Sequence, residues 1–260
     1  MYLKNKKIFI LSVLLLTLSR LTLKIFNIDM VSGFYSQPLI LPFVDTLLNL
    51  LALIGLVLFY FKTKDEGITI FECTSKIRHC GMYYGAIIII ATIINFIKLI
   101  NISHLSVNSL PKPILFIEYL LGIISGIILL LDWHKNIDSK FILFVPLYTS
   151  IYSIERFISF KQVTTVPDQL LETFYLIFTM MFWMEYVKFN EVEKRSRKNT
   201  IFLACGSILF GLPLLISQIT CLVVFAKVSG PSVNSLLVIS ANIVYEFSVI
   251  KGLIYSQKKL

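Results

Sequence analysis

Eight apolar stretches, each about the length of a membrane-spanning helix, make up most of the chain. They cover residues 8–26, 39–61, 82–100, 114–133, 141–160, 170–186, 200–222 and 232–255. About 20 apolar residues in a helix reach across the hydrocarbon core of a bilayer. Because the backbone finds no water there, such stretches must satisfy their own hydrogen bonds, which a helix does. The sequence therefore predicts an all-α, polytopic membrane protein with about eight transmembrane helices.

The composition excludes an ordinary soluble domain. Hydrophobic residues make up 57% of the chain and charged residues 15%, and the mean hydropathy is +0.82. No polar segment exceeds the short connection 62–80, so we predict a single integral membrane domain over residues 1–260. The net charge of +9 would suit nucleic acid, but the basic residues alternate with the apolar stretches, as they do in membrane proteins. We expect no nucleic-acid partner.

The basic residues between the stretches predict the orientation of the chain. Lys and Arg gather near both termini and in every second connection, whereas the opposite connections hold only Lys112, Lys161 and Lys227. An excess of Lys and Arg marks the cytoplasmic side of a membrane protein. Both termini are therefore predicted to be cytoplasmic.

Polar side chains within the spans gather toward the outer half of the membrane in this orientation. They are Arg20, Lys24, Asp45, Asn49, Asn95, Lys98, Glu118, Tyr152, Glu155, Arg156, Gln169 and Glu172. An ionisable group inside a bilayer costs roughly 3 kcal/mol unless it is paired or faces a polar cavity. Lys24 and Lys98 could extend to the outer interface, which explains the shorter Asp45 and Glu118 less well. A polar cavity that opens to the outer half accounts better for the set as a whole.

Two neighbouring spans carry the strongest candidate site. Glu118 lies near the start of one span. Tyr148, Tyr152 and Arg156 are spaced four residues apart in the next, so they share one helical face, with Glu155 beside them. The alternative to a site is an internal Glu118–Arg156 or Glu155–Arg156 ion pair that only tethers helices.

Other motifs lend no support to metal or nucleotide chemistry. The cysteines lack the spacing of zinc ligands and are expected to be reduced thiols: Cys73, Cys80, Cys205 and Cys221. The sequence has no phosphate-binding glycine loop, no HExxH and no GxSxG motif. His104, on the outer side, could titrate near a site. We expect neither a metal nor a cofactor.

Three landmarks resemble the bacterial prolipoprotein diacylglyceryl transferases. KPILFIE, which ends in Glu118, is similar to the family's HPxxLYE, and YSIERFISF, with Tyr152 and Arg156, is similar to YxxxRFxxE. ATIINFIKLI, with Asn95, is similar to part of the family's GRxGNFxNxE signature. The signature's arginine falls on Thr92, and the histidine of the family's HGG segment has no counterpart.

The resemblance implies an enzyme of the bacterial cytoplasmic membrane. Such an enzyme transfers diacylglyceryl from phosphatidylglycerol to the lipobox cysteine thiol of a preprolipoprotein, at the outer face of the membrane. The resemblance implies catalytic roles for Arg156, Glu118 and Tyr152. It also implies lipid contacts for Arg156, Asn95 and Tyr148. Arginine suits the lipid phosphate because its guanidinium can donate two parallel hydrogen bonds.

The likeness covers about residues 40–186 and leaves a further helix pair at about 200–255. Because several motif residues are missing, two other functions remain open. One is a non-catalytic lipid-binding or transport-type membrane protein. The other is a membrane partner within a larger complex.

Overall fold

The computed structural model describes residues 2–27, 40–62, 75–101, 111–134, 137–159, 167–191, 197–225 and 233–255. The helices are α1 (Tyr2–Asn27), α2 (Leu41–Lys62), α3 (Ser75–Asn101), α4 (Lys112–His134), α5 (Ser139–Ile142), α6 (Phe144–Ser159), α7 (Pro167–Glu191), α8 (Arg197–Phe225) and α9 (Val233–Tyr255). They contain eight spans that are long and apolar enough to cross a membrane, and the described ranges contain no strand. The prediction of an all-helical chain with eight potential membrane spans is confirmed.

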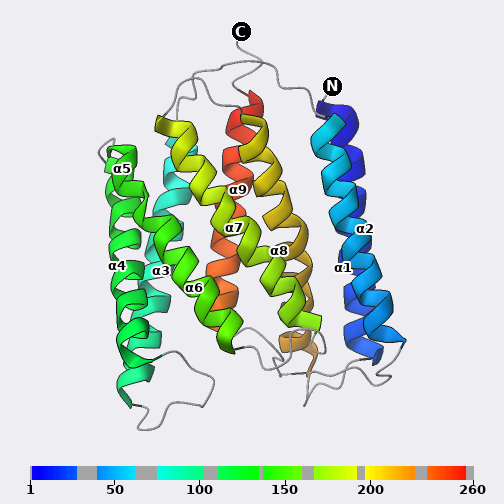
Figure 1. Cartoon of the computed structure of the whole chain (residues 1–260), viewed down its shortest axis with the longest axis horizontal. Coiled ribbons are helices and arrows are strands. Elements are labelled where there is room, and N and C mark those ends of the chain that lie inside the picture. The colour runs from blue at the N-terminus through cyan, green and yellow to red at the C-terminus, as the bar shows by residue number, and fades with distance from the viewer. Residues whose placement is uncertain are drawn as a thin grey trace.

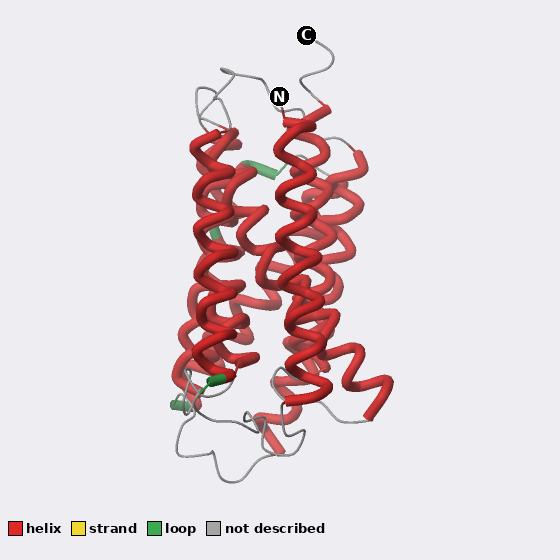
Figure 2. The backbone as a smooth tube through the Cα atoms, turned by 90° about the vertical axis from the view of Figure 1, so that its right-hand side faces the viewer, coloured by secondary structure: helices red, strands yellow, loops and turns green. Residues whose placement is uncertain are grey.

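The long helices run up and down in one bundle, roughly along a common axis (Figures 1 and 2). α1 begins and α9 ends at the same end of the bundle, which we call the terminal end (Figure 1). We call the opposite end the far end. α3, α4 and α6 lie on one side and α1 and α2 on the other, with α7, α8 and α9 between them (Figure 1).

α8 forms the centre of the bundle. Its candidate span is 78% buried, against 22% for that of α2. α8 packs against α1, α2, α7 and α9, and α9 also packs against α3. The sequence comparison with the transferase family left residues 200–255 as an addition to a matched region, 40–186. Buried residues of both regions belong to one hydrophobic cluster.

The fifth predicted span, 141–160, is interrupted at Leu143, which separates α5 from α6. Pro146 explains the interruption, because it has no N–H to donate to the carbonyl four residues earlier. The Ser125 hydroxyl of α4 donates to the Phe144 carbonyl over 2.9 Å. This hydrogen bond attaches the start of α6 to α4.

Glycines allow the closest contacts between helices. A Cβ added at Gly85 of α3 would lie 2.7 Å from the carbonyl oxygen of Gly126 on α4, and the reverse distance is the same. A Cβ at Gly206 of α8 would clash with the Phe178 ring of α7. Small residues are the usual means by which membrane helices bring their backbones together.

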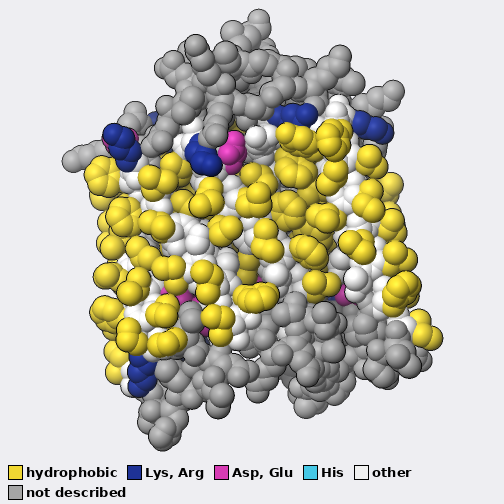
Figure 3. All heavy atoms as spheres, in the orientation of Figure 1, with side chains coloured by type: hydrophobic (Ala, Val, Ile, Leu, Met, Phe, Trp, Pro, Cys, Tyr) yellow, Lys and Arg dark blue, Asp and Glu magenta, His cyan; other side chains and the backbone are white. Residues whose placement is uncertain are grey.

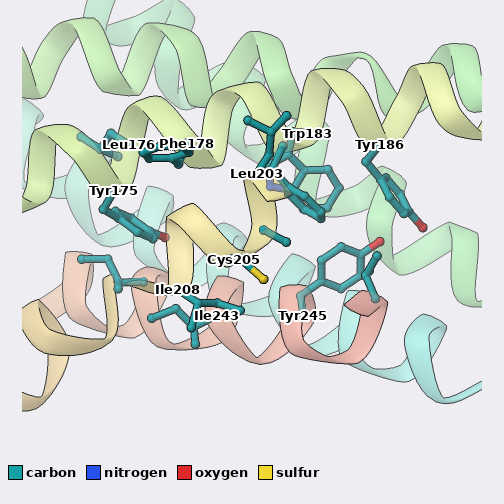
Figure 4. Packing of buried hydrophobic residues seen from close by; sticks show 14 of the residues in the cluster. Tyr175, Leu176, Phe178, Trp183, Tyr186, Leu203, Cys205, Ile208, Ile243 and Tyr245 are labelled. Carbon is teal, nitrogen blue, oxygen red and sulfur yellow. The ribbon is translucent and has the colours of Figure 1, made fainter. Parts of the chain in front are cut away.

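Apolar side chains cover the surface, and several aromatic rings stack in the core. Apolar side chains cover the middle of the visible face, and the coloured Lys and Arg lie toward its margins (Figure 3). Inside, the Trp183 ring stacks on the Tyr245 ring with centroids 4.9 Å apart (Figure 4). Tyr84 stacks on Trp183 at 5.7 Å. These three rings join α3, α7 and α9.

Candidate functional site

A group of paired charges lies inside the far end of the bundle. Arg20 donates to Asp45 over 3.0 Å and to Asp168 over 2.8 Å. Asp168 also accepts from Lys24 over 2.6 Å and from Gln218 over 2.7 Å. All five side chains are buried. We call these five residues the Arg20 cluster.

The Arg20 cluster connects four helices, because its members come from α1, α2, α7 and α8. Its two cations and two anions balance, and every carboxylate meets at least one cation. Lys24 is 0% exposed, so the expectation that it extends to the outer interface is wrong; burial against Asp168 replaces solvent. Lys98, for which the same expectation was held, is exposed.

A second group of charges lies where α4, α6 and α7 meet. Arg156 donates from Nε to Glu172 Oε1 over 2.7 Å and from Nη2 to Glu172 Oε2 over 3.2 Å. The arginine side chain keeps 19% of its exposure, whereas Glu172 is buried. The expected partners, Glu118 and Glu155, are not the ones with which Arg156 forms this pair. The i,i+1 neighbour Glu155 cannot face Arg156 on a helix, and α7 brings Glu172 alongside it.

Glu118 lies beside this pair without hydrogen bonding to it. Its side chain is 3% exposed, and its charged neighbours are Glu155 and Arg156. Its Oε2 atom has no hydrogen-bond partner within the described part of the chain. Of the three carboxyl groups near Arg156, only that of Glu172 contacts the guanidinium, and those of Glu118 and Glu155 lie within electrostatic reach.

Two tyrosines complete this group on the α6 face. Tyr148 and Tyr152 stack with ring centroids 6.0 Å apart. The Tyr152 hydroxyl donates to Ser235 of α9 over 3.1 Å. The prediction that Tyr148, Tyr152 and Arg156 share a helical face agrees with their places on α6. We call Glu118, Tyr148, Tyr152, Arg156 and Glu172 the Arg156 cluster.

Asn95 of α3 is connected to the same end of the bundle by a hydrogen bond to α9. It accepts a hydrogen bond from Asn234 over 3.2 Å, and Asn234 precedes Ser235, the partner of Tyr152. The sequence-predicted site residues therefore gather from α3, α4 and α6, although they are far apart in the chain. Their proposed roles in catalysis and lipid binding stay predictions.

A third polar group lies in the middle of the bundle, next to the aromatic core formed by Tyr84, Trp183 and Tyr245. Glu246 of α9 accepts from Asn242 Nδ2 over 2.9 Å. The side-chain oxygen Oδ1 of Asn242 in turn accepts from Trp183 Nε1 over 3.1 Å. Thr179 and Ser207, from α7 and α8, share a hydrogen bond of 2.8 Å. We call these five residues the Glu246 centre.

Glu246 has no counterion in this centre. It is 0% exposed, and it takes part in none of the ion pairs among the described residues. The Ser207 hydroxyl faces its carboxyl group, and Asn242 donates to Oε1. Oε2 meets no donor in the described ranges.

Polar side chains on one face of α7 lead from the Arg156 cluster to the Glu246 centre. Glu172, Tyr175 and Thr179 are three and four residues apart, which places them on one face of the helix. Tyr175 is buried beside Thr179 and Asn242, and both Glu246 and Tyr152 lie within its electrostatic reach. Tyr152 of α6, these three residues of α7 and Glu246 of α9 together form what we call the polar lane.

Sequence reasoning missed Asp168 and the whole of the Glu246 centre. Asp168 follows the helix-starting Pro167, where an acidic residue is common, so it gave no sign of a tertiary role. Glu246 did give a signal, because it is a single carboxylate inside an apolar stretch with Asn242 one turn before it. An intramembrane carboxylate with a polar neighbour on the same face is a reason to expect a site.

The described helices hold no group of three or more His, Cys, Asp or Glu side chains that could bind a metal ion together. Cys80, Cys205 and Cys221 are free thiols. Cys73 and His104 lie outside the described residues.

The three polar groups together define what this bundle can do chemically. The Arg20 cluster is sealed and balanced, the Arg156 cluster is partly open and rich in carboxylates, and the Glu246 centre holds an uncompensated carboxyl group. Comparison of the chain with family models, curated proteins and solved structures finds no match to any of them.

Proposed function

We propose that this chain is a transport-type membrane protein that carries a small cation along the polar lane. The observation that carries the proposal is the lane itself, which runs along α7 from a partly exposed charge cluster to a carboxyl group in the middle of the bundle. Ionisable side chains in membrane-spanning helices are costly and commonly mark ion or proton paths.

The balance of charge at the Arg156 cluster supports a cation rather than an anion. Glu172 already neutralises Arg156 through two hydrogen bonds. Glu118 and Glu155 place two further carboxyl groups beside the pair. Removing Glu172 from Arg156 in favour of a phosphate would leave a buried carboxylate without its partner, which is expensive. A cation, by contrast, leaves the ion pair in place and finds the carboxyl oxygens of Glu118 and Glu155 beside it, where it can replace their protons.

The orientation predicted from the basic connections gives the lane a direction. In a bacterial cytoplasmic membrane with both termini inside, the far end of the bundle and its Arg156 cluster would face outward. The lane would then admit a cation from the outer side and lead it to Glu246. The apolar belt in Figure 3 is the surface that such a protein would turn to the lipid.

Cation flux through reconstituted protein tests the proposal. Vesicles that contain the full chain are assayed for uptake of radiolabelled sodium, radiolabelled rubidium and protons, each against protein-free vesicles. We expect flux of at least one of these cations, lost in Glu246→Gln and kept in Asp132→Asn, a matched change of an acidic residue near the terminal end of α4. The absence of flux for all three cations would overturn the proposal.

Diacylglyceryl transfer is a second candidate function, and one specific observation favours it. Glu118, Tyr148, Tyr152 and Arg156 lie in one cluster, and Asn95 joins the same end of the bundle. These are the residues to which the resemblance gives roles. Glu118, with a bare buried oxygen, could accept the proton of the incoming cysteine thiol.

This second candidate is tested by incubating the purified chain with phosphatidylglycerol and a lipobox peptide. The transferase account requires a thioether-linked product that depends on Arg156, so Arg156→Ala should abolish it. A product yield equal to that of the Arg156→Ala variant would rule the transferase out.

A further inference from the structure

We infer that the Glu246 centre binds a monovalent metal cation through oxygen ligands, for which sodium is the probe. This inference rests on the proposed function, because it names the ion that the polar lane carries. The ion-binding groups all belong to the Glu246 centre or to α8 beside it.

The first step is the bare carboxylate oxygen. Glu246 is fully buried, and the only donors that reach its carboxyl group in the described helices are Asn242 and Ser207. Oε2 meets none. A buried polar atom without a partner is rare in folded proteins and indicates a bound water or ion when it occurs. A negative charge without a counterion is the more costly case.

The second step is the oxygen atoms gathered around that charge. Ser207 faces the carboxyl group, and its hydroxyl lies 2.8 Å from that of Thr179. Each hydroxyl can turn its proton away and offer lone pairs. Hard cations such as sodium prefer oxygen ligands of this kind, carboxylate and hydroxyl together. The Cys205 thiol of α8 also lies within electrostatic reach of Glu246, but a hard cation takes the oxygen atoms in preference to sulfur.

The third step is the rigidity of the group. Trp183 Nε1 donates to Asn242 Oδ1, and the Asn242 amide donates to Glu246 and, over 3.4 Å, to Thr179. The Trp183 ring is itself held by stacking on Tyr245 (Figure 4). The carboxyl group is therefore oriented before any ion arrives, which reduces the cost of binding.

The fourth step is the charge of the ion. A single carboxylate faces the centre, and no basic side chain of the described helices pairs with it. One positive charge neutralises the group, whereas a divalent ion would leave a net charge in a low-dielectric interior. This balance selects a monovalent cation.

The fifth step is the backbone of α8 next to Ser207. Pro213 lies inside α8 and has no N–H, so the Leu209 carbonyl loses its usual helical donor. Carbonyls released from helical pairing are common sodium ligands in membrane transporters. Leu209 is two residues after Ser207 in α8, so the released carbonyl belongs to the same stretch of helix as one of the hydroxyl ligands.

Trp183 provides a direct reporter for the test. The chain has two tryptophans, so the Trp133→Phe variant leaves Trp183 as the only one, hydrogen bonded to the residue that holds Glu246. The full chain in detergent is titrated with sodium chloride and, separately, with choline chloride at constant pH. We expect a saturable change in Trp183 fluorescence with sodium and none with choline.

Variants in the same Trp133→Phe background decide what causes the change. Glu246→Gln should abolish the sodium response, Ser207→Ala should weaken it, and Asp132→Asn should leave it unchanged. Elution of each variant at the wild-type volume in size exclusion shows that it is folded. A response to choline equal to that to sodium, a sodium response that survives Glu246→Gln, or a response only to pH would overturn the inference, the last because it indicates a proton site.

The binding test and the flux test fail independently. A sodium response without cation flux would leave the site standing and overturn transport. Cation flux without a sodium response would leave transport standing and overturn the site.

Discussion

Two buried carboxylates, Asp168 and Glu246, show opposite ways of placing a negative charge inside the bundle. Asp168 accepts hydrogen bonds from Arg20, Lys24 and Gln218. Glu246 accepts from Asn242, lies near a hydroxyl, and keeps one oxygen without a partner in the described helices. The difference teaches that burial alone does not identify a site. A carboxylate whose charge is fully compensated holds helices together, and one whose charge is not compensated is ready for a ligand.

The Arg156 cluster lies between these two extremes. Its arginine is paired in two places and yet partly exposed, and its neighbour Glu118 is buried with a bare oxygen. It therefore combines a structural ion pair with an unsatisfied acid. This combination is what we expect at the entrance of a path for cations.

Asp168→Ala is expected to give the largest loss of stability. It would remove the carboxylate that Arg20 and Lys24 share, and removing one member of a buried ion-pair group costs about 3–5 kcal/mol. Denaturant unfolding in detergent measures the loss, with Asp132→Ala as the control. A loss no greater than that of the control would show that the Arg20 cluster is not structural.

Glu172→Gln should cost less, about 1–3 kcal/mol, because water can reach the partly exposed Arg156 and compensate part of the lost pair. The same unfolding measurement compares it with Asp168→Ala. Equal losses for the two variants would mean that water reaches the Arg156 cluster no more than it reaches the Arg20 cluster.

Tyr152→Phe should cost about 1 kcal/mol, since it removes one hydrogen bond, to Ser235, and keeps the stacking on Tyr148. Because the substitution also interrupts the polar lane, it should slow cation flux by more than its small effect on stability explains. Parallel unfolding and flux measurements on this variant check the prediction. Unchanged flux would show that the lane does not pass Tyr152.

Glu246→Gln is expected to change stability least, by about 1 kcal/mol or less in the absence of sodium. The amide keeps an acceptor for Asn242 and has the size of the carboxyl group that it replaces, so few contacts of the fully buried side chain change. Unfolding in choline chloride measures this. A loss as large as that of Asp168→Ala would mean that the Glu246 charge is compensated in the native bundle and that the contrast is wrong.

The sequence predicted the helices well and their partners poorly, for physical reasons. Spans are visible because a run of about 20 apolar residues is a local property of the chain. The shared face of Tyr148, Tyr152 and Arg156 is local too, since it follows from helical spacing. The choice of Glu172 over Glu118 as the partner of Arg156 depends on how α6 and α7 pack, and no local pattern contains that information.

The centre of the bundle was hidden for a related reason. Residues 200–255 look like any other pair of apolar helices in sequence, and only the packing of α8 against four neighbours makes them the core. Asp168 was overlooked because an acid at the start of a helix has an ordinary local explanation. Glu246 has no such local explanation, because it is a single carboxyl group in an apolar stretch, and that pattern alone indicates a site.

The most direct test of the central claim is the effect of sodium on the melting temperature of the purified chain. A ligand that binds only the folded state stabilises it by RT ln(1 + [L]/Kd), about 2.7 kcal/mol at a hundredfold excess over Kd. We predict that sodium chloride raises the melting temperature of the wild type and of the destabilised Asp168→Ala variant, relative to choline chloride, and does not raise that of Glu246→Gln. An equal rise in all three, or no rise in the wild type, would contradict the assignment of Glu246 as the ion-binding carboxylate.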